Sequence, residues 1–457
     1  MFVTRQFHFK KVFQYLLVLF FMIGVTFAQD AHYWTLQYGP KSSLLGGAVI
    51  GTVDDVSATF YNPGGLALAS NLAFAVSADV FEISGVKLEG GGGAGVDLGT
   101  SRSGLRPSML AGTITRTLFG KGVLAYSAIT RSRGTQDLEG ILTLSGDDIP
   151  PGIEFKDIAG LARFEGEYSD FWGGLTYSQP LGPHIGLGIS WYGALRSQRR
   201  RREGITQGVR DDGSGVAVID IAGGRYSTIR TLAKIGALAK LGAVTGGITL
   251  TTPSLHISGS GQLGLNSSEI GSDSSSLALT VQTELPAEYK SPLSIGGGLG
   301  IQLGKARLHA SGEWFNKIPS YIVMQGADFQ AQEPEDEIIP VDAVQALDQV
   351  INYGVGLEYA FSEKTNGYLS FYRDNSGLTD DIERASLSTL PIDAKSLSLG
   401  ADLVVGRALL TLGAGYGWGR KLDNELTDLL KREDEDFQAT FVYSGIRILF
   451  GFELGIN

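Results

Sequence analysis

The sequence contains no cysteine, and no long apolar run follows its first 28 residues. The absence of cysteine excludes a disulfide framework and thiolate chemistry. The absence of a further stretch of about 18 or more apolar residues excludes a protein that crosses a membrane with helices. Hydrophobic residues still make up 43% of the chain, so they must be arranged in some other pattern.

Basic residues are also few: 37 Lys and Arg stand against 48 Asp and Glu, which gives a formal net charge of −11. We expect residues 1–28 to be a signal peptide, because three basic residues precede an apolar stretch from Val12 to Phe27 and the small residue Ala28. Its removal takes away three basic and no acidic residues, so the net charge becomes −14. This acidity argues against a nucleic-acid partner.

The hydrophobic residues instead alternate along the chain with smaller or more polar ones. From Ile185 to Leu195 every odd position is apolar or small, and the even positions are smaller or more polar. The segments Tyr353 to Phe361 and Leu410 to Trp418 alternate in the same way. A strand of this kind has one apolar face. A chain full of such strands needs an apolar surrounding, which is typical of an outer-membrane β-barrel.

We predict an all-β fold, a fourteen-stranded antiparallel transmembrane β-barrel. Tight turns and long loops alternate between the strands, so we place the tight turns and both chain ends on the periplasmic side. A short amphipathic helix is expected within the loop at 338–350, where apolar residues recur at helical spacing. The predicted strands are 72–88, 105–119, 121–133, 161–180, 184–200, 225–241, 243–262, 276–303, 305–323, 349–362, 365–376, 393–406, 407–420 and 437–454.

The segment before the first strand is too long for a simple lead-in. The lumen of a fourteen-stranded barrel is too wide to be filled by side chains alone, so residues 29–70 are expected to fold inside it as a plug. The chain then divides into the signal peptide, an N-terminal hatch at 29–70 and a transmembrane barrel at 71–457.

The stretch from Asp54 to Ala67 resembles the N-terminal hatch of the long-chain fatty acid and hydrocarbon transporter family, the FadL and TodX proteins. Gly64 stands where that family usually has Ala. Leu285 and Pro286, within a long predicted strand, are similar to the family's Leu-Pro strand. The positions that match the hatch motif are Asn62, Pro63, Gly65, Leu66 and Ala67.

The resemblance implies passive transport of hydrophobic small molecules across the bacterial outer membrane. In the family, ligand passes from an extracellular groove to a lumenal site closed by the hatch, and leaves sideways at a kink in the third strand. Implied partners are the hydrophobic substrate, outer-membrane lipid and the barrel assembly machinery; a monomer is expected, and no cofactor. The hatch residues assigned to gating are Asn62, Pro63, Gly64 and Gly65.

An inward-facing aromatic group is the predicted substrate lining. The apolar phase of the fourth and fifth predicted strands faces lipid, which turns Tyr168, Trp172 and Tyr192 into the lumen. Folding about the turn at 181–183 brings Trp172 and Tyr192 to nearly the same height. Such a cluster suits an apolar ligand. It would equally suit packing against the hatch, and the two readings are compatible.

A dense basic run lies at the outer end of the fifth predicted strand. Guanidinium groups bind phosphate bidentately, so this run is a candidate contact for lipopolysaccharide phosphates. The alternative is a solvated loop base that happens to be basic. The run consists of Arg199, Arg200, Arg201 and Arg202.

Three other functions are weighed against hydrophobic uptake: a general aqueous porin, a structural or adhesion barrel, and an outer-membrane enzyme. A porin would have a charged constriction loop and no long plug. An enzyme would need a Ser/His/Asp set at the wall, for which only His256 and His309 are available on the lumenal phase. They fall on non-neighbouring strands, so no catalytic residue is assigned. No histidines have the mutual spacing of metal ligands, and no metal is expected.

Overall fold

The computed structural model describes residues 31–69, 73–89, 97–146, 149, 155–271, 275–332, 338–339, 341–378, 392–423 and 439–455. The predicted signal peptide, residues 1–28, lies outside the described residues. Within the described ranges, no helix is long and apolar enough to cross a membrane.

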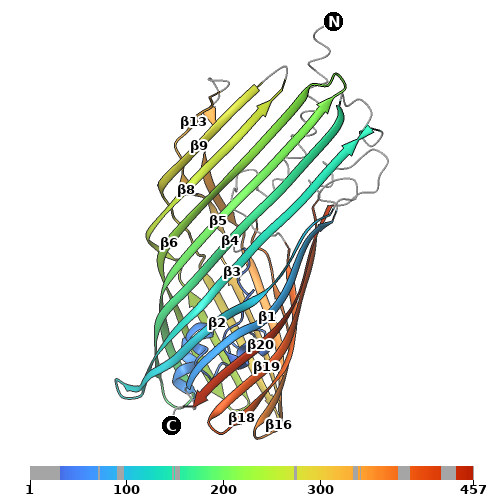
Figure 1. Cartoon of the computed structure of the whole chain (residues 1–457). Coiled ribbons are helices and arrows are strands. Elements are labelled where there is room, and N and C mark those ends of the chain that lie inside the picture. The colour runs from blue at the N-terminus through green and yellow to red at the C-terminus, as the bar shows by residue number, and fades with distance from the viewer. Residues whose placement is uncertain are drawn as a thin grey trace.

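The chain forms a closed antiparallel β-barrel (Figure 1). Most strands pair with their neighbours in sequence, β7 pairs with β6 and β10, β1 pairs with β20, and the pairing of β5 with β6 completes the closure. The sheet consists of β1 (Ala73–Glu89), β2 (Leu98–Leu118), β3 (Gly122–Ser145), β4 (Phe155–Pro180), β5 (Ile185–Arg210), β6 (Gly215–Leu241), β7 (Val244–Thr251), β8 (Leu255–Ile270), β9 (Ser275–Pro286), β10 (Ser294–Leu303), β11 (Ala306–Phe315), β16 (Val350–Ser362), β17 (Thr365–Asp374), β18 (Ala394–Val405), β19 (Ala408–Asp423) and β20 (Ala439–Gly455).

The sheet has sixteen hydrogen-bonded strands, so the predicted count of fourteen is wrong. The predicted strands 243–262 and 276–303 are each broken in two. The first break separates β7 from β8 at Pro253, and the second separates β9 from β10 over a segment that contains Pro292. Proline has no N–H to donate to a ladder, which explains the interruptions. β7 and β8 both pair with β6, one beyond the other.

The apolar side chains of the barrel wall point outward and the polar ones point into the lumen, the reverse of a soluble β-barrel. On β5 the outward side chains Ile185, Leu187 and Leu195 are 43%, 42% and 50% exposed, whereas the inward side chains Tyr192 and Arg196 are fully buried. The predicted alternation is therefore confirmed, with apolar residues outside and polar residues inside.

The predicted tight turns lie at one end of the barrel, but the long loop expected between the predicted strands 184–200 and 225–241 is wrong. β5 continues to Arg210 and β6 begins at Gly215, and a tight turn joins them at the other end. Most of the predicted tight turns contain a glycine with positive φ, which lacks the Cβ that would strain this backbone conformation. These residues are Gly120, Gly182, Gly242, Gly304 and Gly406, with φ between 61° and 97°. Figure 1 shows these turns at the lower end, while β3 to β6, β8 and β9 rise past β1 and β20 at the other.

The predicted helix at 338–350 is wrong. Residues Asp342–Leu347 form a strand, β15, that pairs with β12 (Ile318–Gln325), and Ile338–Ile339 form the short β14, which pairs with β13 (Phe329–Gln330). In β15, Ala343, Ala346 and Leu347 are buried. A short run of apolar residues at mixed spacing is compatible with either a helix or a strand. Here pairing with the neighbouring strand β12 makes it a strand.

Residues 31–69, called the inner segment below, lie inside the lower part of the barrel (Figure 1). The segment contains the short helices α2 (Pro40–Leu44) and α3 (Ala58–Tyr61) and the 3-10 helix η1 (Pro63–Leu68). η1 contacts β4, β5 and β6, and α2 contacts β18, β19 and β20 on the opposite wall. Nearly every side chain of the segment is buried, so it shares one core with the inward-facing side chains of the strands.

Candidate functional site

Asn62 holds the inner segment against the wall. Its amide nitrogen donates to the carbonyl oxygens of Ile50, at 2.8 Å, and Ala237, at 2.9 Å. Its side-chain oxygen accepts from the backbone N–H of Gly64 at 3.1 Å, which caps the start of η1. Asn62 therefore both caps η1 and bonds the inner segment directly to β6.

The two glycines of the motif lie where no side chain fits. A Cβ on Gly64 would lie 2.5 Å from the carbonyl oxygen of Gly186, and one on Gly65 would lie 2.7 Å from that of Val53. Pro63 is packed equally closely against Gly188, where an added Cβ would lie 2.5 Å from it. Gly64 is therefore a point of backbone-to-backbone contact between η1 and β5.

The beginning of the inner segment is bonded to β17 and β11. The carboxylate of Asp374, at the end of β17, accepts from the backbone N–H groups of Tyr33 and Trp34 at 3.1 and 3.0 Å. The Trp34 indole N–H donates to Glu313 on β11 at 3.0 Å. Both carboxylates are buried, and these bonds satisfy them.

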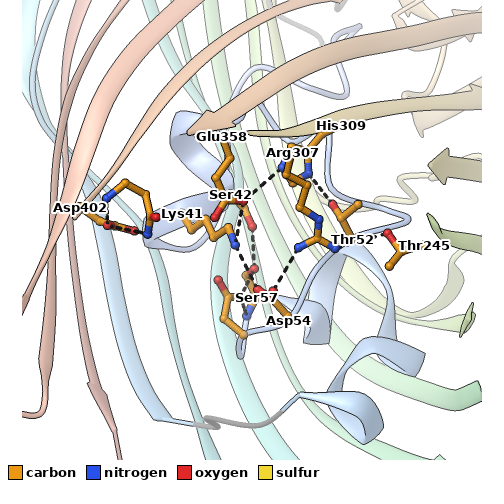
Figure 2. Close-up of polar contacts among 12 residues, drawn as sticks. Lys41, Ser42, Thr52, Asp54, Ser57, Thr245, Arg307, His309, Glu358 and Asp402 are labelled. Atoms are coloured by element: carbon orange, nitrogen blue, oxygen red, sulfur yellow. Dashed lines mark hydrogen bonds and ion pairs between the residues drawn. The ribbon is translucent and has the colours of Figure 1, made fainter. Parts of the chain in front are cut away.

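An ionic cluster joins the middle of the inner segment to β11 and β16 (Figure 2). The Lys41 ammonium lies 3.5 Å from the Asp54 carboxylate and 3.2 Å from that of Glu358. The Arg307 guanidinium lies 3.4 Å from the other oxygen of Asp54. His309 bonds the Thr52 hydroxyl at 2.8 Å through Nδ1 and lies 3.3 Å from Glu358 through Nε2.

The charges of this cluster stabilise one another. Burial alone would raise the pKa of Asp54, but the Lys41 and Arg307 cations outweigh that effect and hold its pKa below the ordinary value of 3.8. Burial would likewise lower the pKa of Lys41, but the Asp54 and Glu358 carboxylates raise it above 10.5. Both groups are therefore charged at neutral pH, and they tie two parts of the inner segment to each other and to the wall.

A small cavity of about 40 Å³ lies above the inner segment. Its lining combines aromatic rings with charged groups from both the inner segment and the barrel wall. The aromatic members are Tyr33, Phe60, Trp172, Tyr289 and Phe315, and the charged members are Arg131, Asp170, Lys234 and Glu313.

Two of the three predicted substrate-lining residues meet at this level. The rings of Trp172 and Tyr192 lie 5.5 Å apart, and Phe60 of the inner segment lies 6.4 Å from Trp172. The Tyr192 hydroxyl donates to the Thr59 carbonyl at 2.6 Å, so Tyr192 packs the inner segment. Trp172 alone of the three lines the cavity. Tyr168 lies under the Arg196 guanidinium, 5.5 Å from its ring centre.

Cations lie against the aromatic rings of the cavity. The Lys234 ammonium is 4.7 Å from the centre of the Phe60 ring, and the Arg131 guanidinium is 5.7 Å from Phe60 and 5.6 Å from Trp172. Lys234 also lies 3.6 Å from Glu313, and Arg230 pairs closely with Asp170. The cavity is thus apolar over its ring faces and positively charged at defined points.

No family model matches this chain, and no curated protein matches it in sequence. Solved structures do match. They include the toluene transporter TbuX of Ralstonia pickettii (11% identity, TM-score 0.58, 92% of this chain and 99% of that chain). The toluene transporter TodX of Pseudomonas putida is 12% identical, with a TM-score of 0.56 over 93% of this chain and all of the other. A FadL homologue of Pseudomonas aeruginosa is 11% identical, with a TM-score of 0.55 over the same shares.

The chain has the FadL/TodX fold. At these identities the likeness shows the fold alone, and it agrees with the resemblance read from the hatch motif. Within this fold, Asn62, Pro63 and Gly64 lie at the contact between the inner segment and β5 and β6 of the wall. Gly65 packs within the inner segment itself, against Val53 and Ala58.

The arginine run is divided between the two faces of β5 in this FadL/TodX barrel. Arg199 and Arg201 are exposed on the outer face, whereas Arg200 and Arg202 are half-buried on the inner face, where Arg202 lies 3.5 Å from Asp220. Only two of the four predicted arginines therefore face outward from β5. Arg225, directly opposite Arg199 on β6, joins them there.

Sequence reasoning missed Arg131, Lys234 and Phe60. Arg131 is the extra residue of a bulge in β3, between the pairs Thr130–Phe171 and Ser132–Asp170. Lys234 continues the inward phase of β6, so alternation could have placed it in the lumen. Among the described residues, no group of three or more His, Asp and Glu could hold a metal ion.

Proposed function

We propose that this chain is an outer-membrane channel for the passive uptake of hydrophobic small molecules of the long-chain fatty acid or hydrocarbon class. The apolar outer wall suits insertion in a bilayer, since the ring of strands closes through β1–β20 and β5–β6 and presents its apolar side chains to lipid. In this proposal residues 29–70 are a hatch and residues 71–457 are the channel, which acts as a single chain.

The observation that carries the proposal is the aromatic cavity above the inner segment. Ligand sites are typically concave, mostly apolar and equipped with a few placed polar groups. Trp172 on β4, Phe60 in α3 and Phe315 on β11 supply the apolar surface of this cavity. A hydrophilic solute gains little from these rings, whereas a hydrocarbon chain is withdrawn from water by them.

The charges favour a ligand with an acidic head within that class. Asp170 and Glu313 are matched by Arg230 and Lys234, and the Arg131 guanidinium lies near the Phe60 and Trp172 rings. A carboxylate can bond to the cationic groups that line the cavity, and its chain can lie against the neighbouring rings. Neutral hydrocarbons would use the rings alone.

An exit to the side is supported by the pairing of β2 with β3. Within these described strands the ladder runs from the turn up to Met109–Ile129, and the next pair is Gly99–Glu139. The gap lies beside the Arg131 bulge, and Pro107 has no N–H to contribute there. We propose that ligand leaves the cavity through this unpaired stretch.

Uptake by cells that lack their own channels of this kind tests the proposal. Trp172→Ala removes roughly 200 Å² of apolar surface, which at roughly 25 cal/mol per Å² weakens binding by at most about 5 kcal/mol. Uptake of a radiolabelled long-chain fatty acid and of toluene should both fall, while leakage of a small hydrophilic dye stays flat or rises. Phe171→Ala, on the outer face of the same strand, is the matched control and should leave all three unchanged.

Two results would count against this function. Hydrophobic uptake that is unchanged in Trp172→Ala would remove the cavity from the path. Equal transport of dye and fatty acid by the native chain would favour the alternative, a general porin or a structural barrel. Arg131→Gln separates the ligand classes, because it should reduce uptake of the acid and spare toluene.

A further inference from the structure

A second hollow lies on the outside of the barrel. The strands that form it belong to the part of the wall that rises past β1 and β20, as Figure 1 shows. Its volume is about 230 Å³, and β5, β6, β8 and β9 form it. It is separated by the sheet from the lumenal cavity, so the proposed transport path does not use it.

Three guanidinium groups border the hollow on one side. Arg199 on β5 and Arg225 on β6 are directly opposite each other, and Arg201 lies one outward position beyond Arg199. Like charges facing each other across a sheet are destabilising unless something neutralises them. Arg201 has Glu203 at 3.3 Å. Glu167 lies across the ladder from Arg199, but it forms no ion pair with Arg199 among the described residues, and neither does any other carboxylate with Arg225.

The rest of the hollow is built from small, amide-bearing and aliphatic residues. Gly223 and Gly264 pair with each other and leave its floor without side chains. Gln262, opposite Arg225, and Asn266, opposite Ile221, present amides on the same face. Val281 and Leu279 complete the rim and are 65% and 52% exposed. Amides suit hydroxyl groups, and an aliphatic rim suits the apolar face of a sugar ring.

The height of the hollow limits what it can meet. Ile185 to Leu195 mark the apolar belt on β5, and Arg199 comes four positions after Leu195. At about 3.3 Å per residue and a tilt of roughly 35–45°, Arg199 lies roughly 10 Å beyond the hydrocarbon edge. In a bilayer this is the level of lipid phosphates and the sugars attached to them.

We propose that this hollow binds the phosphorylated saccharide headgroup of an outer-leaflet glycolipid. Arg199, Arg201 and Arg225 hold a phosphate, the amides of Gln262 and Asn266 bond sugar hydroxyls, and the glycine floor lets the ring approach the sheet. The inference rests on the outer-membrane location in the proposed function, but it concerns lipid anchoring and not uptake.

Binding to the purified full-length barrel in detergent tests the inference directly. The probes are lipopolysaccharide truncated to its lipid and inner-core sugars, the same molecule after enzymatic dephosphorylation, and inorganic phosphate. The native chain should bind the phosphorylated form at least about tenfold more tightly than the dephosphorylated form. In Arg199→Ala/Arg225→Ala that preference should disappear. Arg420→Ala, an exposed arginine paired with Glu89, is the matched control and should keep it.

The outcomes separate the possible sources of phosphate. A preference that persists in the double variant, or that is lost equally in Arg420→Ala, would overturn the site. Displacement of the glycolipid by millimolar inorganic phosphate would overturn the role of the saccharide, leaving a simple anion site. Heat-modifiable migration on a gel shows whether each variant is folded. If the double alanine variant does not fold, Arg199→Lys/Arg225→Lys replaces it in the binding measurement. Failure here leaves hydrophobic uptake untouched, because binding is measured without transport.

Discussion

At the scale of single residues, glycine explains how the inner segment is held. The chain has 64 glycines, and several of them face one another where the segment meets the wall. Besides Gly64 against Gly186, a Cβ on Gly51 would lie 2.2 Å from the carbonyl oxygen of Gly298 on β10. Removing side chains on both partners allows backbone contact and places Asn62 within bonding distance of β6.

Gly64→Ala should therefore destabilise the docked segment, even though alanine is usual at this position in the FadL and TodX proteins. The added methyl meets backbone oxygens of Gly186 and Gly236 at 2.5 and 2.9 Å, and these cannot rotate away. Overpacking of this kind costs about 1–3 kcal/mol. We expect a lower urea midpoint and greater leakage of a hydrophilic dye.

The matched control is Gly193→Ala, on the outer phase of β5, where an added Cβ finds only one atom, at 3.9 Å. It should leave both measurements unchanged. If Gly64→Ala behaves like this control, the contact between η1 and β5 is looser than the structure shows.

Asp54 should make the hold on the inner segment sensitive to acid. Its pKa is lowered in the folded chain by Lys41 and Arg307, so its contribution to stability is complete above the unfolded value of 3.8 and is lost as pH falls through the lower folded value. Proteolysis of the inner segment in detergent, followed between pH 7 and 2, should therefore accelerate in acid. Asp54→Asn should show fast cleavage already at pH 7 and less change with pH. An identical pH profile for the two chains would rule out this role.

At the scale of elements, the weak point of the wall is the junction of β2 with β3. Between Met109–Ile129 and Gly99–Glu139 the described strands share no pair, although both continue as strands through their other neighbours. The bulge at Arg131 turns that side chain into the lumen at the same place.

Hydrogen exchange should report this gap. Amides of β3 between residues 130 and 138 that point toward β2 lack a ladder partner, so they should exchange faster than those between 122 and 129. Amides of the same stretch that point toward β4 provide an internal control, because that ladder is continuous apart from the bulge. Uniform protection of the β3 amides against exchange would contradict the proposed side exit.

Elements also show what the sequence could and could not predict. The alternation of apolar and polar residues predicted the strands and the tight turns, because every second side chain of each strand faces lipid. The breaks at Pro253 and before Ser294 were missed, because alternation continues across them. The strand Asp342–Leu347 was taken for a helix, since its partner β12 is not visible in local spacing.

The candidate site was predicted in part for a similar reason. Alternation on β4 and β5 predicts that Trp172 and Tyr192 face the lumen. Their distances from the turn between the two strands predict that they lie at the same level along the barrel axis. Arg131 is reached only through a bulge, which shifts the phase by one residue. Phe60 comes from the inner segment, and its place against Lys234 depends on how that segment folds inside the closed ring.

At the scale of the whole molecule, the inner segment lies between the aromatic cavity and the lower end of the closed barrel. The segment is attached at several points around the ring: to β6 through Asn62, to β17 through Asp374, and to β11 and β16 through the Lys41 cluster. If the segment is a hatch, passage of ligand requires some of these attachments to move. Its immobilisation should then stop transport.

The most direct test of the account is to lock the inner segment to the wall by a disulfide. The chain has no cysteine, so an introduced pair is unambiguous. Ala48 of the inner segment and Gly354 of β16 suit it, because a Cβ on Gly354 would lie 3.5 Å from that of Ala48, within the usual range for a disulfide. Uptake of the radiolabelled fatty acid by Ala48→Cys/Gly354→Cys is measured when oxidised and after reduction, with each single variant as control. The account predicts loss of uptake on oxidation and its recovery on reduction, and native uptake by the oxidised, cross-linked chain would contradict it.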